Sequence, residues 1–258
     1  GTLDYIESPN LNPRSITWEE VKTLNLGTDI SVFKNRLNAS FDWYQRSTEG
    51  MLTQGATLPS VLGAPSPQEN AADLRTRGFE LSLGYNDSFN LGKDRFDFSF
   101  VGTLSNSITK ITRFNNPNNS LLDYYEGMTI GELWGYHVDG LFQSDEEAAA
   151  HADQTRVSNR IVAAGGLQAG DVKYMDLDND GVISEGENTA DNPGDRRIIG
   201  NTAPQYLYSF KINAAFKGFD FSAFFQGVGK QDWYPHRDSR IFWAMYNRPY
   251  DSYIRKDM

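Results

Sequence analysis

Cysteine is absent from the 258 residues of the sequence. Its absence excludes a disulfide framework and any metal site built on thiolate ligands. It leaves the redox compartment open, because an oxidising compartment does not require disulfides.

Basic residues are in the minority, with 24 Lys and Arg against 34 Asp and Glu and a formal net charge of −10. A nucleic-acid-binding protein needs a basic stripe, and the sequence shows none. The charge balance also argues against electrostatic binding to an anionic membrane surface. We therefore expect no nucleic-acid partner.

Long apolar runs are missing as well. No uninterrupted run approaches the roughly 20 residues of a membrane-spanning helix, and the mean hydropathy is −0.55. Strands of a membrane barrel escape this test, because they alternate apolar and polar residues. The sequence is rich in aromatic residues (16 Phe, 13 Tyr, 5 Trp), which suits β-structure, carbohydrate binding or a membrane interface. No secretory signal opens the chain at Gly1, so we expect it to be absent here or removed.

Apolar and polar residues alternate with a period of two in three pairs of segments, which predicts three β-hairpins. The pairs are residues 24–32 with 37–44, 79–85 with 96–100, and 206–216 with 219–226. Their main apolar positions are Leu24, Leu26, Ile30, Val32, Leu37, Ala39, Phe41, Trp43, Phe79, Leu81, Leu83, Tyr85, Phe96, Phe98, Phe100, Tyr208, Phe210, Ile212, Phe216, Phe219, Phe221 and Phe225. Lys217-Gly218 reads as a tight turn in which glycine supplies a positive φ.

The alternation fits either a β-sandwich or a wide barrel, because both have one polar face. Connections alternate between short turns (33–36, 217–218) and expected long loops (45–73, 111–204). Aromatic residues also cluster near the expected strand ends, as Trp43 and Tyr44, Tyr206 and Tyr208, and Trp233 and Tyr234. Short turns on one side, long loops on the other and aromatic girdles are typical of outer-membrane barrels. The pattern alone leaves both folds open.

The segment 111–204 does not alternate. Residues 129–143 are mixed apolar and glycine-rich, which indicates short strands and turns. Residues 144–152 predict one short helix, with Ser144 as the N-cap and Glu147 completing a capping box.

The acidic run DLDNDGVISEGE, residues 176–187, matches the twelve-residue calcium loop D-x-D-x-D-G-x5-E. Oxygen ligands of this kind suit Ca²⁺, which we expect as a structural cofactor, although a solvated acidic turn is the alternative. We expect Ile183 to point inward and pack. The expected metal ligands are Asp176, Asp178, Asp180, the Val182 carbonyl, Ser184 and Glu187.

Four passages carry a resemblance to a known family. They are SITWEEVKTLNLGTDISVFKNRLNASFDWYQRSTEGML, RTRGFELSLGY, GMTIGELWGYHVDGLFQSDEEA, and AGDVKYMDLDNDGVISEGE with the following DRRIIGNTAPQYLYSFKINAAFKGFDFSAFFQGVGKQD. From about Trp18 to Asp232 the chain resembles the SusC/RagA family of TonB-dependent outer-membrane transporters. The matching residues of the first passage are Trp18, Glu19, Asn25, Gly27, Asp29, Phe33, Asn35, Arg36, Leu37, Asp42, Tyr44 and Leu52.

The resemblance implies an all-β fold of antiparallel hairpins, in which residues 1–258 form the later part of a large transmembrane β-barrel domain. The plug and early strands of the family are not matched, so we expect a fragment of a longer protein. The implied function is TonB-driven import of an oligosaccharide or peptide across the bacterial outer membrane. The implied partners are a SusD-like lipoprotein, TonB through a plug region, and outer-membrane lipid.

Two other functions stay open from the residues alone. One is a secreted, calcium-stabilised β-sandwich that acts as a carbohydrate-binding module or adhesin. The other is a hydrolase on a β-scaffold, which is poorly supported because His137, His151 and His236 are scattered; we expect no enzyme and name no catalytic residue. Aromatic residues near polar ones could line a substrate site or simply pack. These candidates are Trp134, Tyr136, Trp233, Tyr234, Trp243 and Tyr246.

Overall fold

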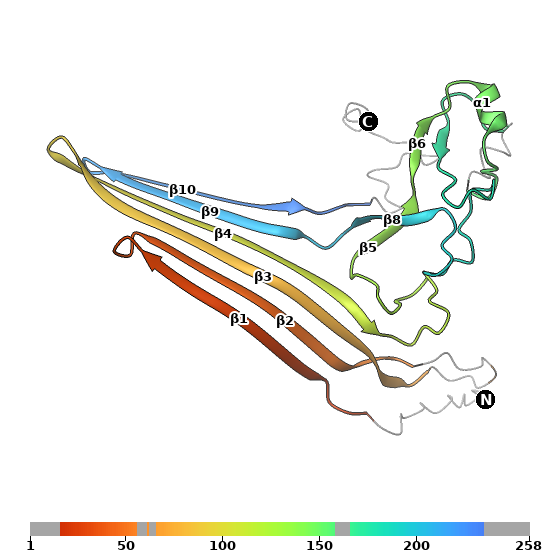
Figure 1. Ribbon diagram of the computed structural model, residues 1–258, viewed down its shortest axis with the longest axis horizontal. Helices are drawn as coiled ribbons and strands as arrows, with labels where there is room; N and C mark the ends of the chain where they lie inside the picture. Colours follow the sequence, from red (N-terminus) through yellow and green to blue (C-terminus); the bar gives the residue numbers. More distant parts are fainter. Residues whose placement is uncertain (1–15, 56–60, 62–65, 158–165, 235–258) are drawn as a thin grey trace, which may run out of the picture.

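The computed structural model describes residues 16–55, 61, 66–157 and 166–234. Within them, one antiparallel sheet of six strands runs in the order β1-β2-β3-β4-β9-β10 (Figure 1). Its strands are β1 (Glu20–Val32), β2 (Leu37–Gln54), β3 (Gln68–Leu91), β4 (Asp94–Arg113), β9 (Gln205–Phe216) and β10 (Phe219–Lys230). The three predicted hairpins are confirmed, and the first two join through β2 and β3.

Tight turns connect neighbouring strands at one end of the sheet. The Lys217-Gly218 turn has φ angles of 52° and 79°, so both residues lie in the left-handed region, as the sequence predicts. The turns after β1 and β3 lie at the same end, at the left of Figure 1, and the long connections lie at the other end.

The strand register places the predicted apolar residues on one continuous face. Leu26 pairs with Trp43, and Trp43 pairs with Phe79. Further along the sheet, Phe100 pairs with Ile212. Directly paired residues point to the same side of a sheet, so the apolar positions of all six strands share one face.

This apolar face is open to its surroundings. Leu26 and Phe221 are both 60% exposed, although one lies on β1 and the other on β10. A sandwich would cover such a face with a second sheet about 10 Å away. In the described part of the chain the other sheets are two-stranded and leave this face exposed. The β-sandwich alternative is therefore not favoured.

The expected bounds of two loops are wrong. The long loop expected at 45–73 is shorter, because β2 continues to Gln54 and β3 begins at Gln68. A register shift between Thr48 and Met51, next to Gly50, breaks the period-two pattern inside the strand. Because β2 continues to Gln54, Trp43 lies within the strand and not near its end. The second long loop begins after Arg113 and not at residue 111.

A smaller folded segment occupies the end of the sheet opposite the tight turns (Figure 1). Its elements are β5 (Glu132–Tyr136), β6 (Val138–Leu141), α1 (Asp145–Ala150), β7 (Val172–Tyr174) and β8 (Arg196–Asn201). β5 pairs with β8, and β6 pairs with β7. Phe142, Ala148 and Ile183 are buried in this segment, so Ile183 packs inward as predicted.

The predicted helix is α1, and its N-cap is confirmed. The Glu147 backbone N–H donates to Ser144 Oγ at 3.2 Å. The Glu147 carboxylate accepts from the backbone N–H of Gln143 at 2.7 Å, one residue before the position of a standard capping box. No helix of the described residues is long and apolar enough to cross a bilayer.

Candidate functional site

The acidic loop 176–187 follows β7 and folds around its own carboxylates. Asp176 accepts the backbone N–H of Asn179 at 2.7 Å and that of Gly181 at 2.9 Å. Asn179 and Gly181 have φ angles of 61° and 82°, in the left-handed region that Asn and Gly tolerate best. The loop therefore coils tightly around Asp176.

The next two aspartates cap backbone groups in the same way. Asp178 accepts the backbone N–H of Asp180 at 3.2 Å, and Asp180 accepts that of Val182 at 2.7 Å. The first, third and fifth positions of the loop are thus each engaged with the backbone that follows. Such local side-chain bonds explain why this stretch forms a loop and not a strand.

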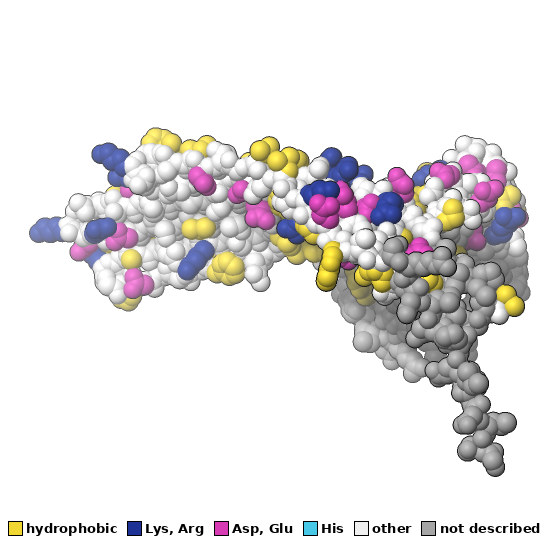
Figure 2. All heavy atoms as spheres, turned by 90° about the horizontal axis from the view of Figure 1, so that it is seen from below, with side chains coloured by type: hydrophobic (Ala, Val, Ile, Leu, Met, Phe, Trp, Pro, Cys, Tyr) yellow, Lys and Arg dark blue, Asp and Glu magenta, His cyan; other side chains and the backbone are white. Residues whose placement is uncertain are grey.

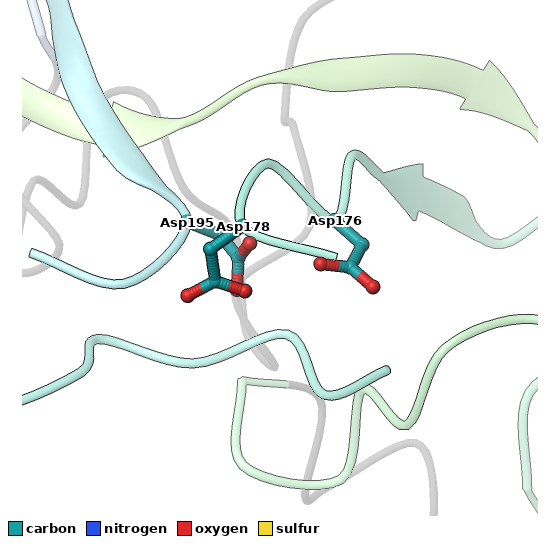
Figure 3. Close-up of side chains that lie close together, drawn as sticks. All are labelled: Asp176, Asp178 and Asp195. Carbon is teal, nitrogen blue, oxygen red and sulfur yellow. The ribbon is translucent and has the colours of Figure 1, made fainter. Parts of the chain in front are cut away.

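Asp195 joins the loop from the segment before β8, and the sequence analysis did not assign it a role. It is 0% exposed. Its carboxylate accepts the backbone N–H of Leu177 at 2.7 Å and that of Ser184 at 2.8 Å. Carboxylate oxygens of Asp176, Asp178 and Asp195 all lie within 4.8 Å of one another. Figure 3 shows these three side chains converging from the loop and from the segment before β8.

The remaining expected ligands lie around this cluster. Ser184 is buried, and its hydroxyl accepts the backbone N–H of Gly186 at 3.1 Å. Val182 forms an isolated bridge with Asp153. Glu187 is exposed, and its backbone N–H donates to the carbonyl of Asn192 at 3.1 Å. The structure therefore gathers Asp176 and Asp178 with Asp195, while Asp180 and Glu187 stand outside that group of three.

The cluster has the chemistry of a hard-cation site. The pKa of Asp178 is raised, first because the loop removes water from it and then because Asp195, Asp180 and Asp176 are negatively charged neighbours. A bound cation would relieve that repulsion. The donors are all oxygens, which fits Ca²⁺ better than Zn²⁺.

The aromatic candidates fall into separate places. Trp134 Nε1 donates to Glu132 Oε1 at 2.9 Å, so its polar edge is already bonded. Tyr136 packs on Tyr174 with ring centroids 5.4 Å apart, and burial raises the pKa of both phenols.

Trp233 and Tyr234, after β10, are 71% and 64% exposed. The negative charge of an ionised Tyr234 also contributes to the raised pKa of Tyr174. Trp243 and Tyr246 lie outside the described residues.

The histidines are scattered as the sequence indicates. His151 lies 2.9 Å, through Nε2, from the carbonyl of Tyr174 and packs edge-on against Phe142. His137 is exposed between β5 and β6. His236 lies outside the described residues.

Comparison with known proteins gives consistent matches. Residues 2–127 match the model of the family described as TonB dependent receptor-like, beta-barrel. TonB-dependent receptor P3 of Formosa agariphila is 28% identical over 225 residues, covering 82% of this chain and 20% of that protein. TonB-dependent receptor P26 of the same organism is 26% identical over 234 residues, covering 88% of this chain and 21% of that protein. The chain thus spans about a fifth of the length of these relatives.

Solved structures share the fold. The RagAB peptide transporter matches with a TM-score of 0.53 and 21% identity, over 81% of this chain and 21% of that one. The RagAB peptide importer in the open-open state matches with a TM-score of 0.56 and 19% identity, over 83% of this chain and 21% of that one. At this identity the likeness establishes the arrangement of strands.

Proposed function

We propose that the chain belongs to the TonB-dependent receptor-like β-barrel family of the outer membrane, whose model matches residues 2–127, and that it forms part of a transporter importing glycans or peptides. The observation that carries the proposal is the two-faced sheet: one continuous apolar face exposed, one polar face opposite. A barrel wall needs this pattern, because one side meets lipid and the other meets the aqueous interior.

The apolar face has the height of a membrane band. On β1 it runs from Leu24 to Val32, which are eight residues apart. At about 3.4 Å per residue and a strand tilt of about 40°, this gives roughly 20 Å. The apolar band of outer-membrane barrels is about 25 Å tall, so the face suits a bilayer.

The opposite face offers hydrogen-bonding groups to a substrate. A row of directly paired residues crosses all six strands at one level, formed by Asp29, Ser40, Ser82, Thr103, Ser209 and Gln226. Thr103 Oγ1 and Ser209 Oγ are 2.7 Å apart. Nearer the tight turns, Asn213 donates to Ser99 Oγ at 2.9 Å. Hydroxyl and amide groups of this kind bond equally well to sugar hydroxyls and to peptide groups.

The folded segment at the loop end would meet the partners. It stands outside the level of the apolar band, where a SusD-like surface lipoprotein would close over the barrel. TonB would act through a plug region of the longer protein. A peptide is the cargo named for the RagAB structures, and a glycan is the substrate that we propose first for this chain.

Two neighbouring residues of β3 test the barrel orientation. Leu81 pairs with Phe41 and Leu104 on the apolar face, and Ser82 pairs with Ser40 and Thr103 on the polar face. Leu81→Arg would place a charge in lipid, at a cost of about 2–4 kcal/mol near the midplane. We expect it to reduce folded barrel in outer-membrane fractions of cells making the full-length protein.

Ser82→Arg is the matched control, with the same new side chain one position away. It should assemble normally and reduce substrate uptake by narrowing the interior. Equal assembly of both variants would contradict a lipid-facing apolar side, and undiminished uptake by Ser82→Arg would contradict the conduit.

We also propose that the loop 176–187 holds a structural Ca²⁺. Asp195 would join the expected set of Asp176, Asp178, Asp180, the Val182 carbonyl, Ser184 and Glu187 as a further ligand or as its anchor. The support is the loop spacing together with the three converging carboxylates. Bound calcium would brace the outer segment against protease, since a ligand that binds the folded state stabilises it.

Asp176→Ala combined with Asp180→Ala tests the calcium proposal. In calcium, this double variant should lose protease resistance in the segment 144–204, and chelator should have the same effect on the unmodified protein. Glu185→Ala with Asp191→Ala removes two exposed acids of the same stretch and should change little. If chelator leaves the unmodified protein equally resistant, the calcium site is ruled out.

A further inference from the structure

Cations gather on the apolar face of the sheet, next to its loop end. Arg75 on β3 lies directly opposite Lys110 on β4. Arg77 lies two residues along β3 from Arg75, on the same face. All three residues are exposed. The strand pairing thus places three positive charges together on the side of the sheet that faces lipid.

Aromatic residues lie immediately beneath these cations on the same face. Trp43 and Phe79 are directly paired, and Phe79 lies two residues from Arg77 on β3. Along β3 toward the loop end, the face therefore changes from Leu83 and Leu81 to Phe79 and then to Arg77 and Arg75. This order matches the change from acyl chains to headgroups in one leaflet of a bilayer.

The three cations have no acidic partner among the ion pairs of the described residues. Arg77 Nε donates to the neutral amide of Gln45 at 2.8 Å. Lys22 lies in the same row, paired with Ser47, which pairs with Arg75. Lys22 differs, because it forms ion pairs with Glu20 at 3.3 Å and Glu49 at 2.9 Å.

The cations line a groove of about 680 Å³. Trp43, Phe79 and Ile108 contribute to its lining, and Glu126 is the one acidic residue among the described residues that line it. Figure 2 shows charged side chains of both signs where the sheet meets the folded segment and at the tight-turn end, with hydrophobic ones along the sheet between them. The groove combines an apolar wall with positive charge, as an amphiphilic anion requires.

We propose that this groove binds the phosphate groups of a phosphorylated glycolipid of the outer leaflet, of the lipid A class, with its acyl chains along Trp43, Phe79 and the apolar face. The proposal rests on the proposed function, because it needs this face to meet lipid at the outer leaflet. Arg75 and Arg77 suit phosphate, since a guanidinium can donate two parallel hydrogen bonds to it. A soluble partner would meet the folded segment before it reached the groove. The apolar wall of the groove also favours a lipid over a soluble partner.

The chain has a net charge of −10, so its overall field does not draw it to anionic surfaces. The cluster is local, and its attraction acts over about one Debye length, roughly 10 Å. Each cation near an anionic headgroup contributes about fivefold to affinity, so removing three should weaken binding by about a hundredfold, and a tenfold loss is the smallest that supports the proposal.

The test uses full-length protein purified from the outer membrane in detergent and delipidated. Native mass spectrometry measures the binding of added diphosphoryl lipid A. The variant Arg75→Ala with Arg77→Ala and Lys110→Ala should lose at least about tenfold in affinity. Arg46→Ala with Lys211→Ala is the control on the opposite face: Arg46 pairs with Thr76 and Lys211 with Val101, and both are exposed. Lys22→Ala is a second control within the same row, where the charge is already neutralised.

Three results would overturn the proposal: equal binding by the triple variant, equal binding of dephosphorylated lipid A, and full competition by inorganic phosphate at the same concentration. The last would mean that the site takes free phosphate and not a lipid. These outcomes are read on protein that assembles in the outer membrane. They therefore differ from a failure of the proposed function, which appears as equal assembly of the two β3 variants or as undiminished uptake by Ser82→Arg.

Discussion

Replacing Asp195 should strongly disturb the folded segment at the loop end of the sheet. Its fully buried carboxylate accepts backbone N–H groups from Leu177 at 2.7 Å and Ser184 at 2.8 Å, so it ties together both halves of the acidic loop. Hydrogen bonds to a charged group contribute about 1.5–3 kcal/mol each. In Asp195→Asn one oxygen becomes an NH₂ group that faces a donor, so we expect a loss of about 2–4 kcal/mol in the local opening free energy.

Hydrogen exchange of the Leu177 and Ser184 amides measures this effect directly. A loss of about 2–4 kcal/mol corresponds to exchange faster by roughly 30- to 1,000-fold. The comparison in chelator reports the hydrogen bonds alone, and any larger loss in calcium reports ligation by Asp195. Glu185→Gln removes one exposed negative charge from the same loop and should leave both amides protected.

Unchanged exchange of both amides in Asp195→Asn would refute the anchoring role. Faster exchange spread evenly over the whole sheet would also refute it, because the anchor acts only within the segment between β7 and β8. An equal loss with and without calcium would keep the anchor and remove Asp195 from the proposed metal ligands.

Three further changes should have local effects. Gly194→Ala should destabilise the segment more than Gly170→Ala: both have positive φ, but only the new Cβ at Gly194 would meet backbone atoms, the nearest at 2.5 Å, and protease resistance would show the difference. Burial raises the pKa of Tyr125, and so does the Glu132 carboxylate, which accepts a hydrogen bond from the Tyr125 hydroxyl. The free energy of unfolding should therefore be at its full value below about pH 10 and fall as pH rises above it. Tyr125→Phe should remove this fall, and its ultraviolet titration should lack the late-ionising phenol. The pKa of Glu147 is lowered, first by the Gln143 N–H and then by Lys173; the stabilisation of α1 should be lost as pH falls below the usual value near 4.5, and Glu147→Gln should remove that dependence in hydrogen exchange of the Gln143 amide.

Alternation was sufficient to predict the hairpins, because the side-chain period of a strand is read within one segment. The tight turn at Lys217-Gly218 was equally local. The end of β2 was missed because the register shift after Thr48 moves later side chains to the other face, which looks like the end of a strand in the sequence.

The site was only partly predictable for a related reason. Asp176, Asp178 and Asp180 follow a spacing that can be read from the chain. Asp195 comes eight residues after Glu187, and the turns between them decide which of the two reaches the cluster. In the sequence it was one more acidic residue in an acidic stretch.

The charge of the lipid-facing surface shows most clearly what pairing adds. A net charge of −10 argued against attraction to anionic lipid, and that argument holds for the chain as a whole. Arg75 and Lys110 are 35 residues apart and become neighbours only through the register of β3 with β4. Lys22 reaches the same row but is neutralised by two glutamates. The sign of a surface therefore depends on which residues are paired across strands, so Lys22→Ala and the triple variant, which alter the same row, should differ in lipid binding.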